Sequence, residues 1–342
     1  MALSEKRISR RYIAILIATL VAVVCFFVFK PKPNRTYQLT GVVWTTDYHI
    51  TYQGSANFTD SVQAVLNAVD MSASVYNKQS LISAINENRS DALDACLTQL
   101  YKASQQVHKA SEGAFDPTVM PLVNAWGFGY KNGQLPTQSQ LDSILQFVGL
   151  AKTRLEQGRI VKQDSRTQFD FSSIAKGYAC DEIGRMLERN GVENYMVEIG
   201  GEVAMKGKSP RGDKWNISID MPVSDPDGSH HESALTLAME HGGVATSGNY
   251  RKYKEVDGKR ISHIVNPKTG KSEESSLLSV TVIAPDCMTA DAWATACMAM
   301  GTEKAKALME NEKKLGVMTI ATAPNGSYEV WSNAAFAAQV AR

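Results

Sequence analysis

The stretch SVTVIAPDCMTADAWAT, residues 279–295, turns an apolar β-branched run into a helical one, and it sets the pattern for the rest of the chain. Val, Ile and Thr favour a strand at 278–284, and the spacing after Pro285 favours a helix at about 289–309. Because strands and helices are interspersed without a steady βαβ rhythm, the expected fold class is α+β, or mixed α/β. The other elements predicted are strands at 195–199, 215–220 and 234–239, and helices at about 60–89, 91–112 and 173–190.

The composition is that of a globular protein. Of the 342 residues, 44% are hydrophobic and 21% are charged, which excludes a disordered or collagen-like chain. Thirty-six Lys and Arg against 35 Asp and Glu leave a net charge of +1. This balance removes the broad cationic field on which nucleic-acid binding depends, so we expect no nucleic-acid partner. Without a visible repeat or linker, residues 37–342 read as one unit, in which two lobes remain possible.

The N-terminus predicts a membrane anchor. Residues 12–29, YIAILIATLVAVVCFFVF, carry no charge and just suffice to span a bilayer. The basic tail at 1–11 favours a cytoplasmic N-terminus, although cations in the tether at 30–36 weaken this asymmetry. We therefore expect a single-pass protein of the inner membrane whose catalytic domain faces the periplasm. A cleaved signal peptide and lipidation at Cys25 are the alternatives, and the residues before each cleavage point fit them poorly.

Four further cysteines, Cys96, Cys180, Cys287 and Cys297, show no spacing typical of zinc or haem sites. Each lies among apolar or small residues, where a buried free thiol is the usual finding. We expect free thiols, although an even number in an exported domain could pair.

The first polar joint is DFSSIAKGY at residues 170–178. Asp170 and two serines precede an amphipathic run, so the free N–H groups of a helix start would face any ligand there. Lys176 lies in the first turn, where the helix dipole disfavours a cation, and an anionic ligand would compensate it. A plain N-cap followed by a surface lysine explains the same residues.

The second joint places Asp291 and Thr295 four residues apart, on one face of the predicted helix. A carboxylate and a hydroxyl suit Mg²⁺ better than Zn²⁺. A capped helix with an incidental Asp and Thr is the alternative. If Asp291 faces a cleft it is not packed, so we expect its replacement to leave folding intact.

Two further segments combine glycines with polar or aromatic residues. In GGVATSGNY, residues 242–250, glycines around Thr246 and Ser247 permit a close approach of the backbone to a ligand. The following ISHIVNPKTG ends in a turn, and His263 lies in the predicted strand before it. The loop-rich stretch at 113–137 begins GAFDPTVMPLVNAWGFG, which suits either a flat ring or an ordered turn.

Taken in order, these blocks resemble the ApbE family, the FAD:protein FMN transferases. The resemblance rests on AFDPTV with NAWGFG, DFSSIAKGYACD, EIGGEV, GVATSGNY, SHIVNPKTG, and SVTVIAP followed by ADAWATA, and it extends from about Gly41 to the C-terminus. It implies an α+β domain of two lobes with a flavin cleft between them. It also implies a reaction in which Mg²⁺ and FAD are used to attach FMN to a Thr or Ser hydroxyl of an acceptor protein through a phosphoester bond, with release of AMP.

The resemblance also assigns site residues, position by position. It implies flavin contacts by Tyr76, by the loop residues Ala114, Phe115 and Asp116, by Asp170 and Lys176, and by the backbone of Val265. The implied Mg²⁺ ligands are Ser173, Asp291 and Thr295, and Asp291 is therefore also expected to be essential for catalysis. His263 is the expected proton acceptor for the attacking hydroxyl, since an ordinary imidazole titrates near pH 6.5.

Three positions depart from the family pattern. Trp44 stands where relatives often have a methionine, so an indole is expected to stack on the flavin. Ala294 replaces an aspartate found in many relatives, which predicts lower metal affinity. Leu81 replaces the usual glutamate of the Ser-Glu-Ile block.

The partners follow from the same resemblance. We expect acceptor subunits of membrane redox complexes, of the Na⁺-translocating NADH:quinone reductase or Rnf type. Two alternative functions are a periplasmic flavoprotein that uses the same pocket to bind or hydrolyse FAD without transfer, and an anchored solute-binding protein, which would not depend on a metal.

Overall fold

The structure is a computed structural model that describes residues 34–129, 135–222, 232–249, 253–256, 259–272 and 276–341, together with Ile15 and Thr19. Within this part, an eight-stranded antiparallel sheet has the order β1-β2-β5-β6-β9-β12-β13-β14. Its strands are β1 (Arg35–Val43), β2 (Thr46–Gly54), β5 (Asn194–Ile199), β6 (Glu202–Lys206), β9 (His241–Gly248), β12 (Leu277–Ala284), β13 (Gly316–Thr322) and β14 (Tyr328–Ser332).

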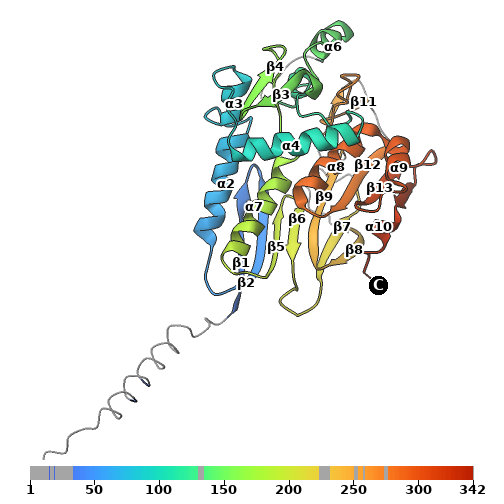
Figure 1. Cartoon of the computed structure of the whole chain (residues 1–342). Coiled ribbons are helices and arrows are strands. Elements are labelled where there is room, and N and C mark those ends of the chain that lie inside the picture. The colour runs from blue at the N-terminus through green and yellow to red at the C-terminus, as the bar shows by residue number, and fades with distance from the viewer. Residues whose placement is uncertain are drawn as a thin grey trace, which may run out of the picture.

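Three two-stranded sheets lie outside the large one, and helices cover it (Figure 1). The pairs are β3 (Thr153–Glu156) with β4 (Arg159–Lys162), β7 (Trp215–Asp220) with β8 (Ser233–Met239), and β10 (Tyr253–Val256) with β11 (Lys259–Ser262). The helices are α2 (Thr59–Ala73), α3 (Leu81–Asn86), α4 (Ala95–Ala110), α5 (Met120–Ala125), α6 (Gln138–Leu145), α7 (Ala175–Arg189), α8 (Cys287–Met300), α9 (Thr302–Met309) and α10 (Ala334–Ala337), with a 3₁₀ turn at Leu150–Lys152.

Alternation along the strands builds two cores on opposite faces of the large sheet. In β6, Val203 and Met205 pack in one core, whereas Ala204 between them packs in the other. Successive side chains of a strand point to opposite faces, so both faces of this sheet are apolar and both must be covered. Helices α2, α4, α7 and α8 cover one face, and the β7–β8 hairpin with α10 covers the other.

A third, smaller apolar cluster forms apart from these cores. It joins Leu122 of α5 and Leu141 of α6 to Val148 and Val265. This cluster supports the loops that flank the predicted flavin contacts.

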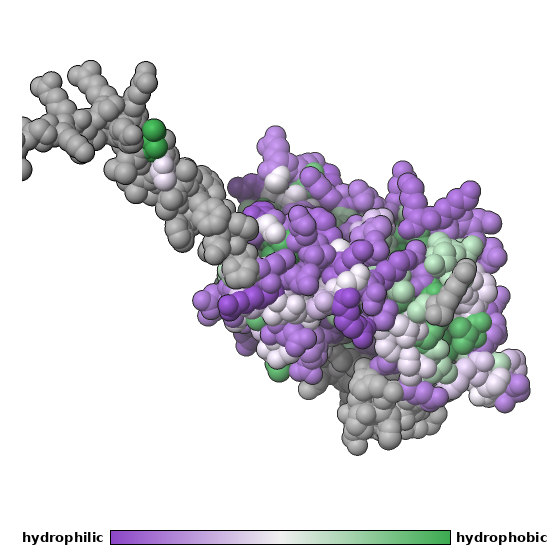
Figure 2. Space-filling view, turned by 90° about the horizontal axis from the view of Figure 1, so that it is seen from below, coloured by the Kyte–Doolittle hydropathy of each residue, from purple (hydrophilic) through white to green (hydrophobic). Residues whose placement is uncertain are grey.

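The surface of the protein is largely hydrophilic on the face shown in Figure 2, where apolar residues gather mainly in one restricted area.

The fold class is confirmed as α+β, and several boundaries are corrected. The helix expected at 60–89 is two helices, because α2 ends at Ala73 and α3 begins only at Leu81. The helix expected at 289–309 is interrupted at Gly301, whose φ of +78° ends α8 before α9 begins. A backbone with this positive φ cannot continue a right-handed helix, and glycine adopts it without strain.

None of the helices in the described part of the chain has the length and hydrophobicity that a membrane span requires. The expected anchor at 12–29 lies outside the described residues, apart from Ile15 and Thr19. Cys180, Cys287 and Cys297 are buried free thiols and Cys96 is a half-buried one, which confirms the expectation for these four residues.

Candidate active site

Helices α7 and α8 cap each other where they meet. Asp291 of α8 accepts a hydrogen bond from the backbone N–H of Gly177 in the first turn of α7, with N···Oδ2 3.0 Å. Asp181 of α7 accepts from the N–H groups of Cys287 and Met288 at the start of α8, both at 2.9 Å. Each carboxylate therefore satisfies helix N–H groups that would otherwise lack a partner.

This reciprocal capping requires close approach of the two helices. A Cβ atom at Gly177 would lie 2.4 Å from the carbonyl oxygen of Cys287, and one at Gly243 of β9 would lie 2.3 Å from the Cα of Cys287. Glycine therefore stands in DFSSIAKGY and GGVATSGNY because α8 packs directly against both backbones. The expectation that the Gly242–Gly243 pair serves a ligand is corrected at Gly243, which serves packing.

Charged and hydroxyl side chains converge at this contact, beside the backbone N–H of Gly177. We call it the α7/α8 junction, and its residues are Lys176, Gly177, Glu202, Ser247, Asp291 and Thr295. Lys176 forms an ion pair with Glu202, and the Thr295 hydroxyl lies 3.3 Å from that of Ser247. Glu202 and Asp291 are 2% and 3% exposed. One ammonium among two buried carboxylates leaves negative charge uncompensated, and this arrangement favours a cation.

Burial is the largest single influence on the pKa of each of these groups. It raises the pKa of Glu202, an effect that the Lys176 charge only partly offsets. It also raises the pKa of Asp291, against Lys176 and the Gly177 N–H. Burial alone would lower the pKa of Lys176, but the charges of Glu202 and then Asp291 outweigh it and raise that pKa.

One of the two interpretations of Lys176 and the expectation for Asp291 are corrected by these contacts. Lys176 needs no anionic ligand to compensate it, because Glu202 of β6 already does so. Asp291 does not lie unpacked in a cleft, because it is buried and holds the Gly177 N–H. The start of α7 also differs from the expectation, since its N-cap is Ile174 and Asp170 instead accepts from the Ser172 N–H at 2.9 Å.

The donor set at the junction fits Mg²⁺. Asp291 and Thr295 lie one turn apart on α8, as the spacing predicted, and Ser247 adds a third oxygen beside Thr295. Hard oxygen ligands of this kind suit Mg²⁺, which completes its shell with water or phosphate oxygens. No cluster of three or more His, Cys, Asp or Glu side chains able to hold a metal is found in the described part of the chain. Ser173 lies in the turn that precedes α7.

The aromatic residues predicted to contact flavin lie at two neighbouring turns. Trp44 is at the tip of the β1–β2 hairpin, and its indole N–H donates to Asp70 of α2, with N···O 3.0 Å. Tyr76 lies in the loop between α2 and α3 and is 64% exposed. Desolvation and then the charge of Asp170 raise the pKa of the Tyr76 hydroxyl.

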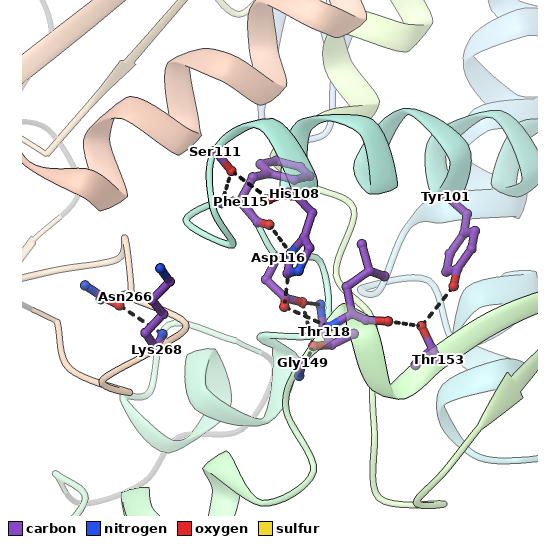
Figure 3. Close-up of polar contacts among 11 residues, drawn as sticks. Tyr101, His108, Ser111, Phe115, Asp116, Thr118, Gly149, Thr153, Asn266 and Lys268 are labelled. Atoms are coloured by element: carbon purple, nitrogen blue, oxygen red, sulfur yellow. Dashed lines mark hydrogen bonds and ion pairs between the residues drawn. The ribbon is translucent and has the colours of Figure 1, made fainter. Parts of the chain in front are cut away.

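Asp116 holds its own loop together (Figure 3). Its Oδ1 accepts from the Thr118 N–H at 2.8 Å and from the Thr118 hydroxyl at 2.6 Å, and its Oδ2 accepts from the Leu150 N–H at 2.8 Å. Phe115 is 1% exposed and Ala114 is 9% exposed. These hydrogen bonds hold the loop in place, and both oxygens of the Asp116 carboxylate accept from groups within the protein.

His263 and Val265 lie on a turn that adjoins this loop. β11 ends at Ser262, so His263 follows the strand and does not lie in it, and its ring contacts Phe128 edge-on with centroids 6.4 Å apart. Val265 is buried in the small apolar cluster. The indole N–H of Trp126 donates to the Gly270 carbonyl at 2.8 Å, which ties the NAWGFG block to the end of the turn.

Backbone contacts join these groups into one region. The Asp170 N–H donates to the Pro117 carbonyl at 2.7 Å, so DFSSIAKGY begins beside AFDPTV. The Gly200 N–H donates to the Asp47 carbonyl at 3.0 Å, so the hairpin tip lies beside the turn that leads to Glu202. Two surface hollows, of about 470 and 250 Å³, are lined by none of the residues predicted to contact flavin or metal, although Asp181 and Gly242 line the smaller one.

The family model described as "ApbE family" matches residues 44–319. The chain belongs to the ApbE family. The FAD:protein FMN transferase of Escherichia coli K12 is 33% identical over 346 residues, covering 93% of this chain and 95% of the relative. That of Haemophilus influenzae is 35% identical over 312 residues, covering 86% and 89%.

Solved structures of the ApbE family share the fold. The flavin transferase ApbE from Vibrio cholerae superposes with a TM-score of 0.80 at 32% identity, covering 90% of this chain and all of that one. The apo form of the Pseudomonas stutzeri flavinyl transferase ApbE gives 0.78 at 31% identity, covering 90% and 97%. The resemblance inferred from the sequence blocks is thus confirmed.

Sequence reasoning overlooked four residues of this ApbE-family site. Glu202 was quoted only as part of the EIGGEV block. Its role in the site becomes clear from its ion pair with Lys176 of α7. Asp70 and Asn77 flank Tyr76 without any motif of their own. Asp181, in the quoted ACD of α7, could have been suspected as an acidic residue on an otherwise buried helix face.

Proposed function

We propose that this chain transfers FMN from FAD to a Thr or Ser hydroxyl of an acceptor protein and releases AMP. In this reaction the hydroxyl oxygen forms a bond to the FMN phosphorus, the pyrophosphate bond to AMP breaks, and the hydroxyl proton goes to a base. The observation that carries the proposal is the α7/α8 junction, where an ammonium, hydroxyls and two buried carboxylates meet beside a helix start. The names of the relatives support the same reaction.

Residues of the junction would bind and orient the pyrophosphate. Asp291 and Thr295, with Ser173 and Ser247, would hold Mg²⁺ through oxygen ligands. When bound, Mg²⁺ neutralises phosphate charge and stabilises the leaving group. The start of α7 would add to this neutralisation, and Lys176, whose charge Glu202 already compensates, would help to position the pyrophosphate, since positioning and charge carry most phosphoryl transfers.

The flavin would lie against Trp44 and Tyr76, near Asp170 and the loop of Ala114, Phe115 and Asp116, with the Val265 backbone on the far side. Because both oxygens of the Asp116 carboxylate accept hydrogen bonds from within the protein, its part is to keep this loop in place. His263 would accept the proton of the attacking hydroxyl.

Acceptor labelling tests this proposal. The purified protein is incubated with FAD, Mg²⁺ and a candidate acceptor subunit, and we expect a covalent fluorescent acceptor band and an equal amount of AMP. Release of AMP without a labelled acceptor would replace transfer by FAD hydrolysis. Flavin binding that is independent of Mg²⁺ and yields no AMP would replace both by a binding protein.

A matched pair of variants sharpens the test. Asp291→Asn removes the charge but keeps an oxygen for the Gly177 N–H, so transfer should be lost while folding persists. Glu303→Gln makes the same chemical change at an exposed position in the first turn of α9 and should leave transfer unchanged. Equal activity of the two variants would exclude Asp291 as a metal ligand.

We also propose that residues 12–29 anchor the protein in the inner membrane, with the catalytic domain in the periplasm. The uncharged run and the basic tail before it support this topology. The acceptors would then be subunits of the Na⁺-translocating NADH:quinone reductase or Rnf type on the same side. Protease added to spheroplasts should degrade the catalytic domain, and full protection would contradict this orientation.

A further inference from the structure

Asp70 joins two turns that are remote in sequence. Its Oδ1 accepts the indole N–H of Trp44, and its Oδ2 accepts the amide N–H of Asn77, with N···O distances of 3.0 and 2.7 Å. Trp44 belongs to the tip of the β1–β2 hairpin, and Asn77 belongs to the loop between α2 and α3. One carboxylate thus uses both oxygens to tie the hairpin tip to that loop.

The position of Asp70 within its helix is unfavourable in itself. It lies in the last turn of α2, which ends at Ala73 and has no basic residue in that turn. The negative end of the helix dipole disfavours a carboxylate there. The two hydrogen bonds to Trp44 and Asn77 are what offset this cost, so the residue is placed for them.

The hairpin tip is strained, and this tie helps to hold it. Trp44 and Thr45 have φ of +49° and +63°, in the left-handed region that favours glycine or asparagine. Bulky residues persist in such conformations only where surrounding contacts fix them, and this strain gathers at functional sites. The Asp70 contact supplies one such constraint directly on the Trp44 side chain.

The loop between α2 and α3, which Asp70 joins to the hairpin tip, is also held by hydrogen bonds. The Asn77 side chain accepts the Gln79 N–H at 2.9 Å, and the Ser83 hydroxyl donates to the Asn77 carbonyl at 2.8 Å. Tyr76, next to Asn77, is nevertheless 64% exposed. A rigid loop therefore presents an exposed aromatic ring.

We propose that Asp70 is a positioning residue that fixes Trp44 and Tyr76 relative to each other so that they receive a flat aromatic ring, the isoalloxazine of FAD. This inference rests on the proposed function, because that function supplies the ring. Asp70 itself touches no reacting atom. Its effect is on flavin binding, in the ground state and the transition state alike.

A donor–acceptor exchange tests the inference. Asp70→Asn can still accept from the Trp44 indole, but its amide N–H₂ then faces the amide N–H₂ of Asn77. We expect this variant to weaken FAD binding about tenfold, with a matching rise in KM and a nearly unchanged rate of AMP release at saturating FAD. A role in folding alone would not produce this split between KM and kcat.

The double variant Asp70→Asn with Asn77→Asp exchanges donor and acceptor. The new amide at position 70 would donate to the new carboxylate at position 77, and that carboxylate would also accept the Gln79 N–H as Asn77 does now. We expect FAD affinity to return to within about threefold of the wild type, a difference worth well under the 1.4 kcal/mol of a tenfold change. Trp44→Phe, which removes the indole N–H, should weaken binding, and adding Asp70→Asn to it should cost less than in the wild type.

The measurements are FAD titration by fluorescence, steady-state AMP release and thermal unfolding, all on the full-length protein. Native FAD affinity in Asp70→Asn, a loss that the exchange does not rescue, or additive effects with Trp44→Phe would each overturn the inference while wild-type transfer stands. A wild type that neither binds FAD nor releases AMP would instead refute the proposed function, and the inference with it.

Discussion

Gly177→Ala should separate helices α7 and α8, and its cost follows from the contacts at that position. The added Cβ would lie 2.4 Å from the Cys287 carbonyl oxygen and 2.8 Å from the Met288 Cα, both backbone atoms that cannot rotate away. Since real Cβ atoms essentially never come within 3.0 Å of such atoms, the helices must part by more than half an ångström. The 3.0 Å hydrogen bond from the Gly177 N–H to Asp291 would then be lost.

Two costs and one gain set the magnitude. Overpacking of a tight core costs about 1–3 kcal/mol, and a buried group left without its partner costs about 1–3 kcal/mol. Alanine is favoured over glycine inside a helix by about 1 kcal/mol. We expect the free energy of unfolding to fall by about 3 kcal/mol, and FMN transfer to require more Mg²⁺ because Asp291 shifts from the start of α7.

Gly184→Ala is the matched control on the same helix. The nearest atoms to its Cβ all belong to the Tyr195 side chain, at 2.7 Å from the hydroxyl, so this variant disturbs a side chain that is hydrogen-bonded to Glu188 and not a backbone contact. Both variants gain the same helix propensity, so their difference reports the backbone clash. Urea unfolding measures both variants. A Gly177→Ala protein within about 0.5 kcal/mol of the wild type, less than the usual cost of a lost hydrogen bond, would refute this reasoning.

Three more outcomes are expected at the same region. Asp291→Ala should abolish transfer and also lower the free energy of unfolding by about 1–3 kcal/mol, because the Gly177 N–H loses its acceptor, whereas native unfolding in this variant would show that the hydrogen bond contributes nothing. His263→Ala should lower the turnover number by roughly 10²–10⁴-fold while FAD affinity is retained. The activity of the wild type should rise with pH through the usual imidazole range. A parallel fall of FAD binding and stability in the variant would mean that His263 has a structural role. Burial raises the pKa of Asp181 to about 7, against the N–H groups of Met288 and Cys287, so folded Asp181 holds a proton that the unfolded chain has released. The contribution of Asp181 to the free energy of unfolding should therefore decrease as the pH rises from about 4 to about 7. In urea unfolding at a series of pH values, Asp181→Asn should lack this pH dependence.

Elements whose signals are local could be predicted from the sequence. The β-branched run at 278–284 and the helical run after it correspond to β12 and α8, and the spacing of Asp291 and Thr295 placed them one turn apart on α8. The ordered blocks identified the family, because several motifs in the same order over most of a chain do not coincide by chance. Such patterns are read from neighbours along the chain, where 3.6 and 2 residue periods decide the face of each side chain.

Which charges meet depends on tertiary packing alone. Lys176 and Glu202 are 26 residues apart, and Gly177 and Asp291 are 114 apart, so neither pairing leaves a local trace. The sequence therefore left an anionic ligand for Lys176 open and placed Asp291 at a cleft, although a protein carboxylate pairs with the first and a backbone N–H holds the second. Gly177 is the clearest instance: its neighbours in sequence permit any helix former, and only the backbone of α8, brought against it by the packing of the sheet, excludes a side chain there.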